Sequence, residues 1–155
     1  MGCTFCATGQ GGFTRQLSSE EIFEQVAELD SFVKRAGGSG LSNIVFMGMG
    51  EPLGNYKAVM SAIERIKGEI GISPRRITVS TVGLPPNIRK LADSNVPCNL
   101  AVSLHESDCE KRSKLMPANR RYGGLDEVSL SVNYVSIKCI WPPSVPQLSI
   151  HQSHH

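Results

Sequence analysis

The segment that decides the fold is RRITVSTVGLPPNIRKLADSNVPCNLAVSLHE, residues 75–106. Its two ends, RRITVSTVG and CNLAVSLHE, have the apolar composition and the short length of buried strands. Between them, PPNIRKLADS is typical of a short helix that begins at proline. A strand, a helix and a second strand in this order predict two parallel strands joined by a helical crossover.

The same alternation continues on both sides of this segment. Upstream, residues 18–38 and 55–71 have helical spacing of apolar residues, and residues 43–52 form a short apolar run that ends at glycines. Downstream, residues 107–116 are predicted to be helical. The chain is therefore predicted to be an α/β protein with a parallel β/α sheet, as in part of a TIM-type barrel.

Apolar side chains at helical spacing define the predicted buried faces of the two upstream helices. Ser18 or Ser19 can cap the first helix, and the glycine pair at 37–38 ends it. The side chains expected to face the core are Ile22, Val26, Leu29 and Val33 in the first helix, and Val59, Ile63 and Ile66 in the second.

The pattern weakens after about Asp126. Residues 128–141, VSLSVNYVSIKCIW, are compatible with one strand, and residues 142–155 have the prolines, serines and histidines of an irregular tail. The domain prediction is a partial β/α domain over residues 1–128 and a divergent tail over 129–155. In this interpretation the three tail histidines form no designed metal site: His151, His154 and His155.

Composition limits the classes of protein to consider. The chain has 155 residues, 40% of them apolar and 19% charged, which suits one globular domain. Its net charge of +2 is too small to indicate nucleic-acid binding by itself. No run approaches the roughly 18 apolar residues of a membrane span, so no membrane association is expected, and the N-terminus does not resemble a secretory signal. Five scattered cysteines favour a reducing compartment.

Ligands of parallel β/α folds gather at the carboxyl ends of the strands. This rule selects three loops, residues 48–52, 80–83 and 103–106, each of which carries small or polar residues. Any one of them could be an ordinary connection. Three such loops, together with a pair of cysteines near the N-terminus, favour a binding site.

Cys3 and Cys6 form a CxxC motif that is compatible with three kinds of chemistry. A redox pair would open a helix directly, whereas a glycine-rich loop follows Cys6. A zinc site would need two more ligands, and neither Cys98 nor Cys109 has suitable spacing. An iron–sulfur cluster held by thiolates of one short loop suits the glycines, because backbone must approach a bulky inorganic body closely.

Five blocks of the sequence resemble, in order, the RlmN family of radical S-adenosylmethionine RNA methyltransferases. The blocks are MGCTFCATGQGGFTRQL (1–17), NIVFMGMGEPLGNY (43–56), RRITVSTVGLPPNIRKLA (75–92), LAVSLHES (100–107) and RSKLMPANRRY (112–122). The resemblance implies a radical SAM core and methylation of adenosine C2 in large-subunit rRNA and, in some members, tRNA.

The resemblance also implies a set of site residues. Cys3 and Cys6 match the last two cysteines of the family's CxxxCxxC motif, which binds a 4Fe-4S cluster as the metal site. The S-adenosyl-L-methionine contacts of the family fall on Gly50, Glu51, Ser80, Ser103, Leu104 and His105. A carboxylate such as Glu51 can accept charge-assisted hydrogen bonds from the ammonium group of the cofactor.

Further expectations follow from the family. An electron donor such as flavodoxin or ferredoxin would reduce the cluster, and RNA would be the substrate. The candidate phosphate contacts are Arg75, Arg76, Arg120 and Arg121, for which solvated surface charge is the simpler interpretation. The expected location is the cytoplasm, or a plastid or mitochondrial interior in a eukaryote.

The chain also departs from the family pattern. The first cluster cysteine would lie two residues before Met1, and the family resemblance ends near Val128. Cys139 has the wrong surroundings for the methyl-carrying cysteine, so no catalytic residue is assigned. The sequence therefore predicts a chain truncated at both ends, with weak or no methyltransferase activity. Two other hypotheses remain: a non-catalytic β/α remnant that binds a nucleotide or a partner, and a thiol redox protein.

Overall fold

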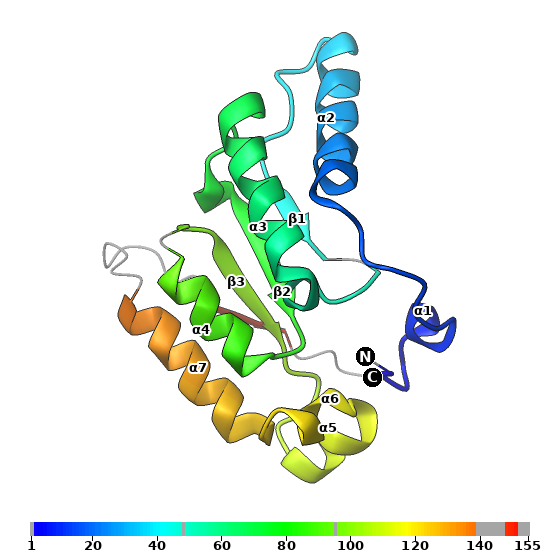
Figure 1. Ribbon diagram of the computed structural model, residues 1–155, viewed down its shortest axis with the longest axis vertical. Helices are drawn as coiled ribbons and strands as arrows, with labels where there is room; N and C mark the ends of the chain where they lie inside the picture. Colours follow the sequence, from blue (N-terminus) through cyan, green and yellow to red (C-terminus); the bar gives the residue numbers. More distant parts are fainter. Residues whose placement is uncertain (1, 48, 95, 139–147, 152–155) are drawn as a thin grey trace.

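Four parallel strands form a single sheet in the computed structural model, which describes residues 2–47, 49–94, 96–138 and 148–151. The strands are β1 (Ile44–Phe46), β2 (Ile77–Thr81), β3 (Asn99–Ser103) and β4 (Leu148–His151). Their spatial order follows the chain, and each pairs in parallel with the next (Figure 1). The predicted fold class, a partial β/α barrel, is confirmed.

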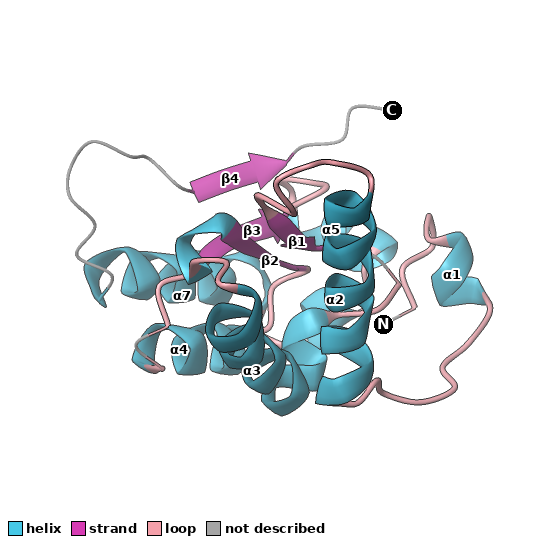
Figure 2. Ribbon diagram, turned by 90° about the horizontal axis from the view of Figure 1, so that it is seen from above, coloured by secondary structure: helices cyan, strands magenta, loops and turns pink. Residues whose placement is uncertain are grey.

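Helices cover one face of this sheet (Figure 2). The larger helices are α2 (Ser19–Arg35), α3 (Tyr56–Arg65), α4 (Pro85–Asp93) and α7 (Gly124–Lys138). Helix α2 packs on α3, and α4 packs on α7. A π-helical turn, η2 (Ile66–Ile70), extends α3.

Shorter elements gather where the strands end. They are α1 (Ala7–Gln10), α5 (Cys109–Leu115), α6 (Ala118–Arg121) and the 3-10 turn η1 (Pro52–Asn55); a further 3-10 turn, η3 (Pro74–Arg76), precedes β2 at the opposite end. Figure 1 shows α5 and α6 beyond the ends of β2 and β3. The short elements thus surround the edge at which β/α proteins bind ligands.

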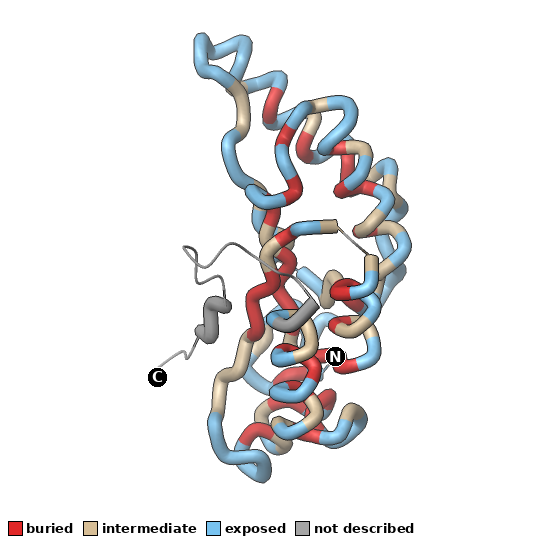
Figure 3. Tube along the Cα trace, turned by 90° about the vertical axis from the view of Figure 1, so that its left-hand side faces the viewer, coloured by how far each residue is buried: buried red, intermediate tan, exposed pale blue. Residues whose placement is uncertain are grey.

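Side chains alternate between the two faces of each strand. Ile77 and Val79 are fully buried and join the core beneath the helices, as do Leu100 and Val102 of β3. Ser80 lies on the other face, beside its register partner Ala101. Figure 3 shows that the buried residues follow the strands and the inner sides of the helices. The core therefore lies on the helical face, and small or polar residues line the other face.

Helix α2 begins as the sequence predicts. The Ser18 hydroxyl accepts a hydrogen bond from the Glu21 amide, and the Glu21 carboxylate accepts one from the Ser18 amide, which completes a capping box. Ile22 and Val26 are buried as expected, but the prediction for Leu29 is wrong, because this side chain is 57% exposed. The buried position on that turn belongs to Asp30, which accepts a hydrogen bond from the Leu41 amide at 2.8 Å.

The structure differs from two predictions for the second half of the chain, the strand over residues 128–141 and the irregular tail. The strand predicted over residues 128–141 is wrong, because α7 continues to Lys138; residues 139–141 lie outside the described residues. The helix is favoured by packing, since Val128 and Val132 are buried one turn apart against the core. Within the predicted tail, Leu148–His151 form β4 beside β3, while His154 and His155 lie outside the described residues.

Strand β1 was predicted to be buried, and it is an edge strand instead. Val45 is 53% exposed on its outer face, whereas Phe46 packs against the core. The second predicted helical face is confirmed, with Val59, Ile63 and Ile66 all buried. Among the helices of the described residues, none combines the length and the apolar character needed to cross a membrane.

Candidate functional site

Three loops meet at the carboxyl edge of the sheet. They follow β1, β2 and β3, and they contain the residues that the sequence singles out. Parallel pairing places these strand ends side by side, since Phe46 is in register with Val79 and Thr81 with Val102. The contacts described below join the three loops to one another and to the CxxC segment.

Glu51 connects the first loop to the second. Its carboxylate accepts hydrogen bonds from the amides of Leu53 (3.0 Å) and Val82 (2.8 Å). Burial raises the pKa of Glu51, and the amide of Val82, the hydroxyl of Thr81 and the amide of Leu53 oppose this rise in pKa. Because a carboxylate has about four lone-pair sites, Glu51 can still accept hydrogen bonds from a ligand ammonium.

Gly50, the other residue of the predicted contact in this loop, has a backbone φ of +119°. L residues with a side chain rarely adopt this conformation, so glycine permits the turn that places Glu51 against Val82. A Cβ atom at Gly50 would meet no heavy atom within 4 Å, so the backbone conformation, not crowding, requires glycine here.

Ser80 and Ser103 lie side by side on the open face of the sheet. Their hydroxyl oxygens are 3.5 Å apart, and Ser80 is buried. They belong to neighbouring strands, with Ser80 paired to Ala101 and Ser103 two residues further along. Two hydroxyls at this distance can donate to or accept from the same polar ligand.

His105 adopts a left-handed backbone conformation, with φ of +61°. Such a conformation is uncommon outside glycine and is found preferentially where surrounding contacts maintain it. Its ring lies 4.4 Å from the ring of Phe5, measured between centroids. Phe5 stands between the two cysteines of the CxxC motif, so this contact joins that motif to the loop after β3.

The CxxC segment folds as a short turn and a single helical turn. The Cys6 thiol accepts a hydrogen bond from the Gly9 amide at 3.3 Å and caps α1. The Thr4 amide donates to the Leu115 carbonyl at 3.0 Å, which ties the segment to α5. Cys3 is buried, and burial raises the pKa of its thiol, while the positive charge of Arg112 partly opposes the rise.

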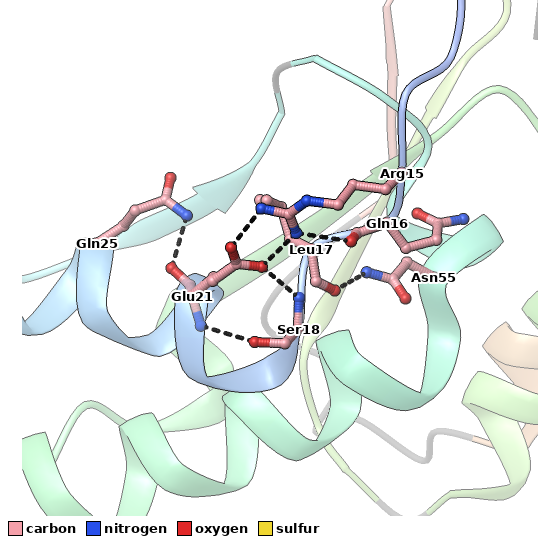
Figure 4. A network of polar contacts seen from close by, with 7 residues as sticks. All are labelled: Arg15, Gln16, Leu17, Ser18, Glu21, Gln25 and Asn55. Carbon is pink, nitrogen blue, oxygen red and sulfur yellow. Dashed lines mark hydrogen bonds and ion pairs between the residues drawn. The ribbon is translucent and has the colours of Figure 1, made fainter.

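A second set of contacts involves residues 15–17, which lie between the CxxC segment and α2, and joins them to η1 in the loop after β1. Figure 4 shows Arg15 facing Glu21 across the start of α2, where its guanidinium donates two hydrogen bonds to the carboxylate at 2.6 and 2.7 Å. The Asn55 side-chain amide donates to the Leu17 carbonyl at 2.7 Å (Figure 4). The side-chain amide of Gln16 donates to the Gly54 carbonyl at 3.3 Å. These contacts fix the chain between Cys6 and α2 beside η1.

The donor set does not complete a 4Fe-4S site. A cluster of this type is held by protein thiolates, and Cys3 and Cys6 supply two of them. Within the part of the chain that the structure describes, His, Cys, Asp and Glu side chains form no group of three or more that could hold a metal ion. Two sulfurs alone therefore do not fit the whole cluster.

Two site residues escaped the sequence reasoning. Arg112 is 1% exposed, and its guanidinium donates to the carbonyls of Leu104 (3.0 Å) and Val82 (2.5 Å) and to the side-chain oxygen of Asn119. Asn119 is also buried. In the sequence, Arg112 stands among charged residues of a short helix, a pattern typical of a solvated surface. Only the position of the helix reveals its burial.

The four candidate RNA-binding arginines divide between the two ends of the sheet. Arg75 and Arg76 belong to η3, directly before β2, whereas Arg120 and Arg121 end α6, which follows β3 and α5. All four are exposed. Only Arg120 and Arg121 lie at the edge that carries the site residues.

Comparison with protein families matches residues 1–128 to the Radical SAM superfamily. The chain therefore belongs to the radical SAM superfamily. A solved structure with the same fold, a radical SAM methyltransferase from Sphaerobacter thermophilus, has a TM-score of 0.82 and 44% identity. That match covers 87% of this chain and 40% of the other.

Among curated proteins, the chain resembles those named probable dual-specificity RNA methyltransferase RlmN. The protein of Bifidobacterium adolescentis is 56% identical over 130 residues, which is 79% of this chain and 34% of that protein. The protein of Rhodococcus erythropolis is 51% identical over 146 residues, or 89% of this chain and 39% of that protein. The RlmN resemblance is thus confirmed, and the chain spans little more than a third of the length of these relatives.

Proposed function

We propose that this chain binds S-adenosyl-L-methionine at the carboxyl ends of β1, β2 and β3, as the cofactor-binding part of an RlmN-type methyltransferase. The family activity is methylation of adenosine C2 in large-subunit rRNA, and of tRNA in some members. The observation that carries the proposal is the convergence of three loops, in which Glu51 contacts Val82, Ser80 faces Ser103, and His105 meets Phe5 of the CxxC motif.

Each residue has a role that suits its chemistry. Glu51 accepts the ammonium group of the cofactor, and the glycine before it allows close approach of the backbone. Ser80 and Ser103 offer hydroxyls to the ribose or to the amino-acid portion. Leu104 offers its backbone amide, since its carbonyl already accepts from Arg112 and from the Glu106 amide. His105 offers a ring that can contact the adenine edge.

The iron–sulfur chemistry is proposed only in part. Cys3 and Cys6 are candidate cluster ligands, and the single helical turn α1 brings the backbone of Gly9 close to Cys6, because a Cβ at Gly9 would lie 3.5 Å from the Cys6 sulfur. The described residues add no third ligand, so no reaction step is derived through the cluster. We expect the isolated chain to have weak or no methyltransferase activity.

RNA is the proposed substrate of the whole protein, on the strength of the RNA methyltransferases that the chain resembles. Arg120 and Arg121 are the better candidates for phosphate contacts, because they lie at the site edge of the sheet. A one-electron donor such as flavodoxin or ferredoxin is the proposed reductant. Cys3, Cys6 and Cys109 are free thiols, which supports the cytoplasm or another reducing compartment as the location.

Calorimetric titration with S-adenosylmethionine tests the binding site. Glu51→Gln removes the charge that would face the ammonium, and we expect its affinity to fall about tenfold to a hundredfold. Glu69→Gln is the matched control, because Glu69 pairs with Arg65 on the exposed surface of η2. Equal affinities for both variants and the unchanged chain, or no binding by any of them, would contradict the proposal.

The incomplete donor set favours a second candidate function, a non-catalytic protein that binds the cofactor or a related nucleotide without iron. Anaerobic reconstitution with iron and sulfide separates the two. If the chain carries only a remnant of the site, iron content stays below one cluster per chain, and the cofactor binds equally well before and after the treatment. A stoichiometric cluster together with cofactor cleavage would establish the radical enzyme.

A further inference from the structure

Arg112 lies in the interior of the molecule, and among the residues that the structure describes its three hydrogen-bond partners include no carboxylate. Its acceptors are the carbonyls of Val82 and Leu104 and the side-chain oxygen of Asn119, all of them neutral. Taking a guanidinium out of water is costly unless several oriented acceptors replace the water. At this position each acceptor is held in place by the fold, and two of the three belong to the loops of the candidate site.

The backbone of Val82 connects Arg112 to Glu51. The Val82 carbonyl accepts from Arg112 at 2.5 Å, while the Val82 amide donates to Glu51 at 2.8 Å. On the other side, Arg112 holds the carbonyl of Leu104, directly before the strained His105. One buried side chain therefore bridges the loops after β2 and β3, and through Val82 it reaches the loop after β1.

Asn119 orients the guanidinium of Arg112 by accepting a hydrogen bond from it. The side-chain amide of Asn119 donates to the Cys109 carbonyl at 3.2 Å and to the Ser113 hydroxyl at 2.8 Å. With its nitrogen fixed to α5, its oxygen can only face Arg112. This arrangement leaves the remaining guanidinium donors aimed at the two loop carbonyls.

We propose that Arg112 is a positioning residue that holds the loops after β2 and β3 so that Glu51 and His105 face the same bound S-adenosylmethionine. The proposal rests on the proposed function, because it assumes that these loops bind the cofactor. A residue that served packing alone could be replaced by an apolar side chain of similar length without changing how the Glu51 carboxylate is hydrogen-bonded.

The test compares Arg112→Met and Arg112→Lys with Arg89→Met in the full chain. Arg89 is the matched control, because its guanidinium makes one surface ion pair, with Glu127 at 2.7 Å. We expect Arg112→Met to weaken S-adenosylmethionine binding about tenfold or more, Arg112→Lys to recover part of the affinity, and Arg89→Met to change it less than about twofold.

The pH dependence of binding distinguishes positioning from general stability. If Val82 loses its anchor, its amide no longer stabilises the carboxylate of Glu51, so the pKa of Glu51 rises further. Binding of the cofactor ammonium by Arg112→Lys should then require a higher pH than binding by the unchanged chain, and the Val82 amide should shift in a ¹⁵N–¹H spectrum. The groups that face Glu51 are the Thr81 hydroxyl and the amides of Leu53 and Val82.

The outcomes are distinguishable. If the unchanged chain does not bind the cofactor, the proposed function fails and this inference fails with it. If the unchanged chain binds and the Arg112 variants bind equally well with the same pH profile, the inference alone is overturned. Should Arg112→Met not fold, as judged by its thermal transition, Arg112→Lys decides the question by affinity and pH profile.

Discussion

Glu51 combines burial with two backbone hydrogen bonds, and the balance between them determines its charge. Burial raises the pKa of its carboxyl, and the Val82 amide restrains the rise. The same carboxylate that contacts two loops is the group that we propose binds the cofactor ammonium. An ammonium group at this position would remove the cost of the buried negative charge.

The raised pKa predicts how stability depends on pH. A carboxyl whose folded pKa lies above its ordinary value of 4.5 binds more protons in the folded state than in the unfolded state. Its contribution to the free energy of unfolding is therefore greatest below pH 4.5 and falls as the pH rises through the folded pKa. Denaturant unfolding of the unchanged chain and of Glu51→Gln across this range should show their difference falling and then levelling off. A difference that grows with pH would contradict the prediction.

At position 83, both the backbone conformation and the packing of α7 require glycine. The φ of Gly83 is +98°, and a Cβ atom there would lie 2.8 Å from a methyl carbon of Val128 in α7. We expect Gly83→Ala to lower the free energy of unfolding by about 1–3 kcal/mol, because it strains the backbone and displaces α7. Gly68→Ala is the control: no heavy atom lies within 4 Å of a Cβ there, and alanine favours a helix. Thermal melts of both variants measure the difference.

At the scale of elements, the start of α2 is defined by side-chain contacts that the sequence encodes locally. Ser18, Glu21 and Arg15 form one network, and their hydrogen bonds lower the pKa of Glu21 to about 2. Ser18 also marks the end of the segment that runs from Cys6 to the start of α2. A substitution of Ser18 is therefore expected to change the conformation of the start of α2 and of the preceding loop.

Ser18→Ala should reduce the free energy of unfolding by about 1 kcal/mol, because the Glu21 amide loses its hydrogen-bond acceptor. For a chain of this size, this corresponds to a fall in Tm of about 2–4 °C. Ser19→Ala provides the comparison, since the Ser19 hydroxyl donates to the exposed Glu20 carboxylate and does not cap the helix. Equal melting temperatures for the two variants would show that the cap contributes nothing measurable.

The elements near the site were predictable to different degrees. The strands β2 and β3 and helix α4 follow from composition and from proline at the start of the helix. Helix α7 was missed, because residues 128–138 alternate small and apolar residues in a way that also suits a strand. What decides the helix is tertiary: Val128 and Val132 lie against the core, whereas Leu130, which a strand would place on the same face, is 59% exposed.

At the scale of the whole molecule, a single core lies between the sheet and its helices. Ile63 of α3 is fully buried there, whereas Leu29 of α2 is 57% exposed despite its helical spacing. Periodicity places a residue on a face of its helix, but it does not say how far the neighbouring element extends to cover that face. The spacing of apolar residues therefore predicts more buried residues on α2 than the structure contains.

Shortening the side chain at Ile63 and at Leu29 should distinguish a buried position from an exposed one. Ile63→Ala removes methyl groups from a filled interior, and we expect a loss of about 2–5 kcal/mol in the free energy of unfolding. Leu29→Ala should change it by less than about 0.5 kcal/mol. Urea unfolding at constant temperature measures both, and a large effect at Leu29 would show that its side chain is buried by something not seen in the single chain.

The sequence by itself determined the β/α alternation and the capping of α2, because these depend on local spacing and side-chain chemistry. Resemblance to the RlmN family, and not spacing, singled out Cys3, Cys6, Glu51 and His105. Only the tertiary structure decided that Phe5 meets His105, that Ser80 faces Ser103, and that Arg112 is buried between two loops. These contacts join residues far apart in the chain, and their free energy depends on parallel strands ending at one edge. The roles of these residues in cofactor binding stay predictions that the binding experiments address.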